Sequence, residues 1–220
     1  MKTRLVIFGN QDFARLAKAY FDYDSNYDVV GFTVDKPYLE GDMFEDLPIL
    51  PFDTVQGHFS PENHEFFVAT GYKKLNALRA QKCREAISKG YKLASYLSPK
   101  AQIMTREPIG HNAFICEGVT VHPWVNIGDG VVILTGTLVG HHATVGDYCF
   151  VSGNVILAGY SWVGQHCFLG ANSTIRNHCR VESDCIIGAG ATLLEDAEQG
   201  GVYRGSGALR SQRSSQAQLI

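Results

Sequence analysis

The most regular feature of this chain is an aliphatic residue at every sixth position between residues 97 and 193. Leu, Ile or Val fills 17 consecutive positions of the series, from Leu97 through Val145 to Leu193, without an insertion. A period of six matches neither the period of about 3.6 residues of an α-helix nor the two-residue alternation of a strand. It is typical of a parallel β-helix, in which three six-residue repeats make one triangular coil.

Two further positions of the repeat carry a pattern. The residue after the aliphatic one is glycine in seven repeats: Gly110, Gly128, Gly140, Gly146, Gly164, Gly170 and Gly188. Because glycine adopts positive φ at little steric cost, we expect these residues to form the corners of the coil. The fifth position is small or β-branched, as at Ala113, Val125 and Thr137. Each repeat therefore turns two side chains inward, one large and one small.

Before residue 96 the spacing changes to alternating strands and helices. Residues 4–8, 28–34 and 65–70 are predicted strands. A helix follows the first strand, with one apolar face formed by Phe13, Leu16, Ala17, Tyr20 and Phe21. A second helix is predicted over residues 73–89, with Leu75, Leu78, Ala86 and Ile87 facing inward.

This alternation predicts a small α/β domain with a parallel, Rossmann-like sheet. We therefore expect the Rossmann-like domain over residues 1–95, the β-helix over residues 97–198, and a C-terminal turn and tail over residues 199–220.

Nucleotides bind at the carboxyl ends of the strands in sheets of this kind. The loop after the first strand, Gly9 to Phe13, lacks G-x-G-x-x-G and lysine, so neither a dinucleotide cofactor nor a P-loop is expected. Asp35 ends the second predicted strand, where its carboxylate is able to accept hydrogen bonds from a ribose or a base. It is equally well explained as an aspartate that ends a strand and begins a turn.

Composition narrows the function classes further. The chain has 220 residues, is 45% hydrophobic and 19% charged, and carries a formal net charge of −3, which does not favour a nucleic-acid partner. It shows no leader and no apolar run near the ~20 residues of a membrane span, so no membrane association is expected. Four of six cysteines (Cys149, Cys167, Cys179 and Cys185) occupy the small inward position, which predicts reduced, buried thiols in a cytoplasmic protein.

A short Rossmann-like domain followed by six-residue repeats resembles the bacterial sugar acyltransferases of the sialic acid O-acetyltransferase type. These include N-acetyltransferases for nucleotide-linked amino sugars such as bacillosamine and perosamine. The resemblance runs from the strand at residues 5–9 to the turn at residues 201–205. Its most specific stretch is L-V-G-H-H-A-T-V-G-D at residues 138–147. It implies a left-handed β-helix, a homotrimer, acetyl-CoA in the groove between adjacent prisms, and a nucleotide-linked amino sugar on the N-terminal domain.

The resemblance also implies site residues. The catalytic base falls on His141, with His142 beside it where some members have an acidic residue. Acetyl-CoA contacts fall near Gly159, Ala171 and Ala189. Contacts to the nucleotide-linked sugar fall on Gln11, Asp12, Phe13 and Asp35. The loop at residues 9–13 departs from the family's version, which contains glycine and histidine.

The chemistry expected of His141 is general-base catalysis. It occupies the third position of its repeat, next to a corner, so its imidazole points outward and is able to take a proton from a nucleophile near neutral pH. His142, as the next residue along a strand, is expected to point to the other side and to orient rather than to transfer a proton. We expect direct transfer to an amine, with the backbone N–H of Gly159 holding the oxyanion and no acyl-enzyme.

The sequence leaves three other functions open for a protein with this prism. They are a sugar O-acetyltransferase, a non-catalytic scaffold, and a metalloenzyme like the γ-carbonic anhydrases. Against a metal, His142 and His178 are two coils apart, too far for one ion to bridge, and no metal cofactor is expected. The outward aromatics favour contacts between subunits of the trimer. They are Phe114, Trp124, Phe150, Trp162 and Phe168.

Overall fold

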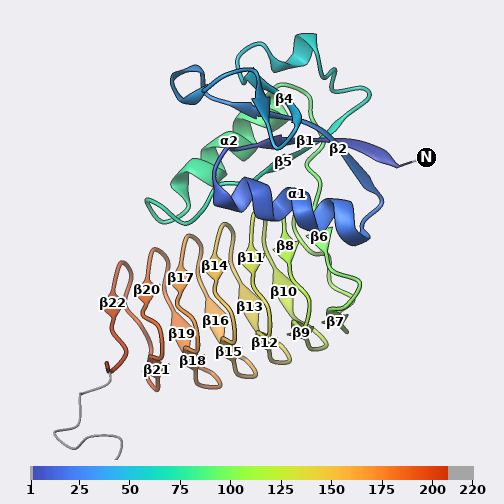
Figure 1. Ribbon diagram of the computed structural model, residues 1–220. Helices are drawn as coiled ribbons and strands as arrows, with labels where there is room; N and C mark the ends of the chain where they lie inside the picture. The colour runs from blue at the N-terminus through green and yellow to red at the C-terminus, as the bar shows by residue number, and fades with distance from the viewer. Residues whose placement is uncertain (1, 208–220) are drawn as a thin grey trace, which may run out of the picture.

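A computed structural model describes residues 2–207 of the chain, so residues 208–220 of the predicted C-terminal tail lie outside the described residues. Figure 1 shows an α/β domain seated on one side of a triangular prism of stacked coils. Within the described range, no helix has the length and apolar character needed to cross a bilayer.

The N-terminal domain is a five-stranded sheet in the order β3-β4-β2-β1-β5. The parallel strands are β1 (Thr3–Phe8), β2 (Tyr27–Val34), β4 (Leu47–Pro51) and β5 (Glu65–Val68). β3 (Met43–Phe44) pairs antiparallel to β4 at one edge. The helices are α1 (Asp12–Asp24) and α2 (Ala77–Ser88), with single 3-10 turns at Lys36–Tyr38 and Val55–Gly57. The Rossmann-like sheet was expected, but β3 and β4 were not.

The second helix differs from its prediction. Lys74, Leu75 and Asn76 have φ of 52°, 48° and 63°, so α2 begins only at residue 77. Leu78 and Ile87, expected inside, are 42% and 54% exposed. Ala86 is buried as predicted, and the other buried residues of α2 are Arg79, Ala80, Lys82 and Cys83. The reason is that polar contacts of Arg79 and Lys82 set the rotation of the helix, and an apolar pattern does not show these.

The prism is made of three parallel sheets of two-residue strands, which confirms the left-handed β-helix. The first sheet stacks β6 (Tyr96–Leu97), β8 (Phe114–Ile115), β11 (Val132–Ile133), β14 (Phe150–Val151), β17 (Phe168–Leu169), β20 (Ile186–Ile187) and β22 (Val202–Tyr203). The second stacks β7 (Gln102–Ile103), β9 (Thr120–Val121), β12 (Leu138–Val139), β15 (Ile156–Leu157), β18 (Thr174–Ile175) and β21 (Thr192–Leu193). The third stacks β10 (Asn126–Ile127), β13 (Thr144–Val145), β16 (Trp162–Val163) and β19 (Arg180–Val181).

The prism interior is filled by the two predicted positions of each repeat. From residue 113 to residue 193 the aliphatic residue and the small residue are both buried, as Val145 and Cys149 show with no exposed surface, whereas Leu97 at the start of the series is 41% exposed. All six cysteines are buried and unpaired, which confirms the burial predicted for the four inward thiols. Each of these four also donates a hydrogen bond to a backbone carbonyl, as Cys149 does to Gly164 (2.9 Å). Burial of apolar side chains along the whole axis is the main stabilising term of this domain.

Glycine occurs at the second position of the repeat for a different reason from the one expected. Positive φ occurs instead two residues later, at the fourth position, where His142 and His166 both have φ of 59°. The glycines after the strands allow coils to approach closely. A Cβ atom at Gly146 would lie 2.7 Å from the carbonyl carbon of Gly164, and one at Gly170 would lie 2.5 Å from the amide nitrogen of Ala189. The corners therefore select glycine for close stacking rather than for backbone conformation.

The aromatic residues on the first sheet do not face a partner subunit. Phe114 and Phe150 are buried beneath the N-terminal domain, where the Phe13 ring lies 5.3 Å and 6.3 Å from theirs. Tyr72 covers Phe168, with ring centroids 4.7 Å apart. For Phe114 and Phe150 the expectation of trimer contacts is wrong, because the chain covers this part of its own first sheet. Phe168 remains half-buried. Trp124, on the opposite corner, is 58% exposed.

Candidate active site

His141 lies on the corner between the second and third sheets, in the turn that joins β12 to β13. The turn is tied to the coils on both sides: the amide of His142 donates to the carbonyl of Pro123 (3.2 Å), and the amide of Tyr160 donates to the carbonyl of His141 (2.9 Å). The His141 side chain is exposed. A rigid scaffold therefore presents one imidazole to solvent at the predicted place.

Gly159 lies directly against the ring of His141. A Cβ atom at residue 159 would come within 2.8 Å of both Cε1 and Nε2 of His141. Among residues 2–207, the backbone N–H of Gly159 has no hydrogen-bond acceptor. A free backbone donor on the residue that packs against an imidazole is one feature expected of an acyl-transfer site.

His142 is positioned differently from the expectation that it points away along a strand. It belongs to the turn and has φ of 59°, so its ring returns toward the ring of His141. The two Nδ1 atoms are 3.1 Å apart. None of the ion pairs in the described part of the chain involves either histidine.

Ala171 and Ala189 lie on a different corner from His141 and Gly159. They follow β17 and β20 on neighbouring coils, at the corner between the first and second sheets. The amide of Gly190 donates to the carbonyl of Ala171 (2.8 Å). The whole second sheet separates them from the histidines, so one chain does not bring the predicted acetyl-CoA contacts together.

The predicted sugar-nucleotide residues are at the carboxyl edge of the N-terminal sheet, but only some are accessible. Gln11 and Asp12 are exposed at the start of α1, where Asp12 contacts Arg15 at 3.4 Å. Phe13 is half-buried in the contact between the two domains. No local pattern in the sequence indicates this packing role, since Phe114 and Phe150, which Phe13 contacts, lie more than a hundred positions away.

Asp35 forms an ion pair with Lys82, a residue that the sequence pattern did not single out. The Nζ atom of Lys82 lies 2.6 Å from Asp35 and 2.7 Å from Glu85. Burial alone lowers the pKa of Lys82, but its hydrogen bonds to Asp35 and Glu85 raise the pKa above the ordinary value. A cavity of about 350 Å³ opens beside this cluster, lined by Asp35, Phe52, Asp53, Glu85, Ser88 and Lys89. Phe52 follows β4, a strand that the sequence pattern did not reveal.

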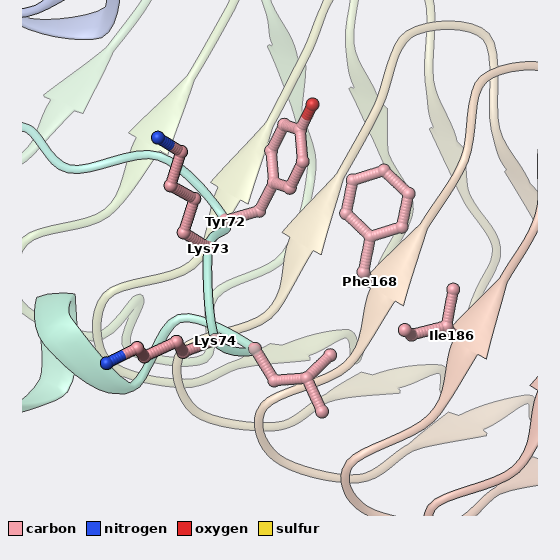
Figure 2. A pocket seen from close by; sticks show the side chains of 6 residues that line it. Tyr72, Lys73, Lys74, Phe168 and Ile186 are labelled. Atoms are coloured by element: carbon pink, nitrogen blue, oxygen red, sulfur yellow. The ribbon is translucent and has the colours of Figure 1, made fainter.

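A second cavity, of about 400 Å³, lies between the loop that follows β5 and the first sheet of the prism. Its lining residues are Tyr72, Lys73, Lys74, Leu75, Phe168 and Ile186. Figure 2 shows Tyr72 near Phe168, while the amino groups of Lys73 and Lys74 point to the side away from Phe168 and Ile186. Neither cavity includes His141. Within residues 2–207 there is no cluster of three or more histidine, cysteine or acidic side chains that would hold a metal ion.

Comparisons with known proteins agree with this architecture. The family described as bacterial transferase hexapeptide (six repeats) matches residues 160–195. A comparison with curated protein sequences gives no match.

Three solved structures cover most of the chain. The acetyltransferase domain of PglB from Neisseria gonorrhoeae is 21% identical, with a TM-score of 0.81 over 93% of this chain and 97% of that one. PerB from Caulobacter crescentus, in complex with CoA and GDP-perosamine, is 24% identical, with a TM-score of 0.79 over 91% and 93%. WeeI from Acinetobacter baumannii is 16% identical, with a TM-score of 0.64 over 87% and 95%. The chain therefore shares its two-part fold with these three structures over nearly its whole length.

Proposed function

We propose that this protein is an acetyl-CoA-dependent N-acetyltransferase that acts on the amine of a nucleotide-linked amino sugar. The observation that carries the proposal is an exposed imidazole, His141, whose Cε1–Nε2 edge packs against Gly159, a residue whose backbone N–H has no acceptor among residues 2–207. The fold adds support, because a structure of the PglB acetyltransferase domain contains acetyl coenzyme A and the PerB structure contains CoA and GDP-perosamine.

The proposed reaction is a direct transfer. The amine nitrogen attacks the thioester carbonyl while Nε2 of His141 removes its proton, and CoA leaves as the thiolate. The N–H of Gly159 stabilises the oxyanion. No cysteine is suited to form an acyl-enzyme, because all six are buried. Burial raises the pKa of Cys83 to about 12 and that of Cys116 to about 11.

We propose where the substrate binds and how the subunits assemble from the positions of the remaining residues. We assign the nucleotide to the carboxyl edge of the N-terminal sheet, with Gln11, Asp12, Phe13 and Asp35 as contacts and the neighbouring cavity available to it. Because Ala171 and Ala189 occupy another corner from His141, we assign the acetyl-CoA groove to adjacent prisms of a homotrimer. Six unpaired cysteines suit a reducing compartment, so the proposal keeps the cytoplasmic location.

The test is an assay of CoA release with acetyl-CoA and a panel of UDP-, GDP- and dTDP-linked amino sugars. The panel includes the matching hydroxyl sugars. His141→Asn should lower kcat by about 10²- to 10⁴-fold, the usual contribution of a general base. His111→Asn is the matched control, because His111 is an exposed histidine at the same position of another repeat. Light scattering should show an unchanged trimer.

Near-normal turnover of His141→Asn would remove His141 from its role. Transfer only to hydroxyl sugars would convert the proposal to O-acetylation. Calorimetry that detects no heat with acetyl-CoA would leave the scaffold interpretation in its place.

A further inference from the structure

Four aromatic rings stack along the corner that carries His141. We call Trp124, His142, Tyr160 and His178 the ring ladder; they occupy the same position of four successive coils, 18 residues apart. The Trp124 and His142 rings are 4.6 Å apart at 26°, the His142 and Tyr160 rings 4.5 Å apart at 7°, and the Tyr160 and His178 rings 4.8 Å apart at 8°. His142 is thus covered on both faces although it lies on the surface.

The ladder directs one nitrogen of His142 at the base. With both faces stacked, the His142 ring has little freedom to rotate, and its Nδ1 lies 3.1 Å from Nδ1 of His141. A neutral imidazole has one N–H donor and one acceptor nitrogen, so this contact needs a proton on only one of the two Nδ1 atoms. When His141 donates, its own Nε2 is the unprotonated nitrogen. Nε2 is also the nitrogen beside Gly159.

We propose that His142 is a positioning residue that accepts a hydrogen bond from the Nδ1–H of His141, and that the ring ladder holds His142 for this task. The inference rests on the proposed function, since the base needs a lone pair at Nε2. It assigns to a neutral imidazole the work that a carboxylate does in other base–orienter pairs. Trp124 acts only through His142, because its ring contacts His142 and not His141.

The first test reads the tautomer directly. Protein labelled with ¹⁵N at its histidines gives imidazole nitrogen shifts that distinguish Nδ1–H from Nε2–H, and His141→Asn identifies the signals of residue 141. In the native protein, at a pH where the rings are neutral, His141 should be the Nδ1–H form. His142→Phe keeps a ring in the ladder but has no acceptor, and it should abolish this preference. Trp124 and Tyr160 already hold aromatic side chains at φ of 61°, so phenylalanine fits this backbone.

The second test is kinetic. His142→Phe should lower kcat by about 10- to 100-fold with little change in KM, as loss of an orienting partner does. His142→Asn should recover part of the loss, because its amide oxygen accepts a hydrogen bond and asparagine tolerates positive φ. Trp124→Ala should lower kcat by about twofold to tenfold in the otherwise native protein. Added to His142→Phe, it should cause no further change in kcat, because a double-mutant cycle isolates effects that pass through His142.

The outcomes separate this inference from the proposed function. A native His141 in the Nε2–H form, or a tautomer that His142→Phe leaves unaltered, would overturn the positioning role even if acetyl transfer is efficient. An additive effect of Trp124→Ala in the two backgrounds would overturn the role of the ladder. A native protein that transfers no acetyl group refutes the proposed function, whereas the tautomer measurement still reports on the pair of rings.

Discussion

Two corners of the same prism have the same backbone and very different surroundings. The open corner carries the ring ladder and His141. The covered corner, between the third and first sheets, carries Asn112, Tyr148 and His166 at the equivalent positions and lies under the N-terminal domain. His142 and His166 have the same φ, 59°, and each stacks on a tyrosine one coil away.

The difference lies in what packs on each corner. At the covered corner, Asn112 exchanges two hydrogen bonds with the backbone of Val68, at 2.7 Å and 3.1 Å. Nδ1 of His166 lies 3.2 Å from the carbonyl oxygen of Leu75. At the open corner the equivalent nitrogen of His142 meets another imidazole instead. The six-residue repeat thus gives the two corners the same backbone conformation. The packing of the N-terminal domain determines which corner is covered and which stays exposed.

The largest expected effect is at Arg79, the buried link between α2 and the covered corner. Its guanidinium donates to Asn76 and to the backbone oxygens of Thr70, Gly71, Gly130, Tyr148 and Cys149. Burial lowers its pKa to about 10, so it is charged at neutral pH. Arg79→Met should reduce the free energy of unfolding by about 3 kcal/mol, because buried acceptors lose their donor.

Urea unfolding measures this loss. Arg84→Met is the control, since Arg84 is exposed on the same helix and its replacement should change stability by less than about 0.5 kcal/mol. Equal effects of the two substitutions would show that Arg79 does not hold the domains together.

A substitution at Gly159 tests whether the position of the His141 ring at the open corner matters for catalysis, because it adds a methyl group without removing any functional group. In Gly159→Ala the new Cβ would lie 2.8 Å from Cε1 and Nε2 of His141, so the ring must move. Because a small displacement of a catalytic group costs about 10²-fold in rate, kcat should fall on this order, while the melting temperature stays nearly constant. Gly57→Ala, where an added Cβ meets nothing within 4 Å, should leave both unchanged. Normal turnover of Gly159→Ala would argue against the placement of the base.

Glu117 makes the stability of the folded state depend on pH at the edge of the covered first sheet. Its carboxylate accepts hydrogen bonds from Tyr20 of α1 (2.7 Å) and from Thr135 (2.9 Å). Partial burial raises the pKa of Glu117, but these bonds outweigh it and the pKa lies below its ordinary value. A depressed carboxyl pKa stabilises the folded state above the unfolded-state pKa of about 4.3, and this contribution is lost as the pH falls through the folded-state value.

Glu117→Gln should therefore cost about 1 kcal/mol at pH 7 and progressively less below pH ~4.3. Urea unfolding at pH 7, 5 and 3.5 measures the difference between the two proteins. A constant difference across the three pH values would contradict the role of the ionised carboxylate.

The smallest effect is expected from the counterpart of the His142→Phe test. His166→Phe keeps the stack on Tyr148 and removes the hydrogen bond to Leu75, so it should cost about 1 kcal/mol of stability with kcat unchanged. His142→Phe should do the reverse. If both substitutions affect stability alone, the two corners do not differ in kind.

The periodicity of the sequence was enough to determine the prism. Two inward residues per repeat, such as Val145 and Cys149, define the coil because burial depends on local spacing that recurs every six residues. The exposed place of His141 at a corner follows from the same register. Strands β1, β2 and β5 and the first helix of the N-terminal domain were also predictable, since α1 and β1 carry ordinary apolar periodicities, whereas β3 and β4 were not.

Only the tertiary structure decided which parts of the prism are free. The pairing of Arg79 with the covered corner and of Lys82 with Asp35 joins residues distant in sequence, and no local spacing reports such contacts. The return of the His142 ring to His141 depends on a positive φ, which is uncommon for residues other than glycine and which the equivalent position of other coils shares. The spacing of residues along the chain determines the coil that repeats along the prism axis. Tertiary contacts between residues distant in sequence determine which repeats are covered and which are exposed.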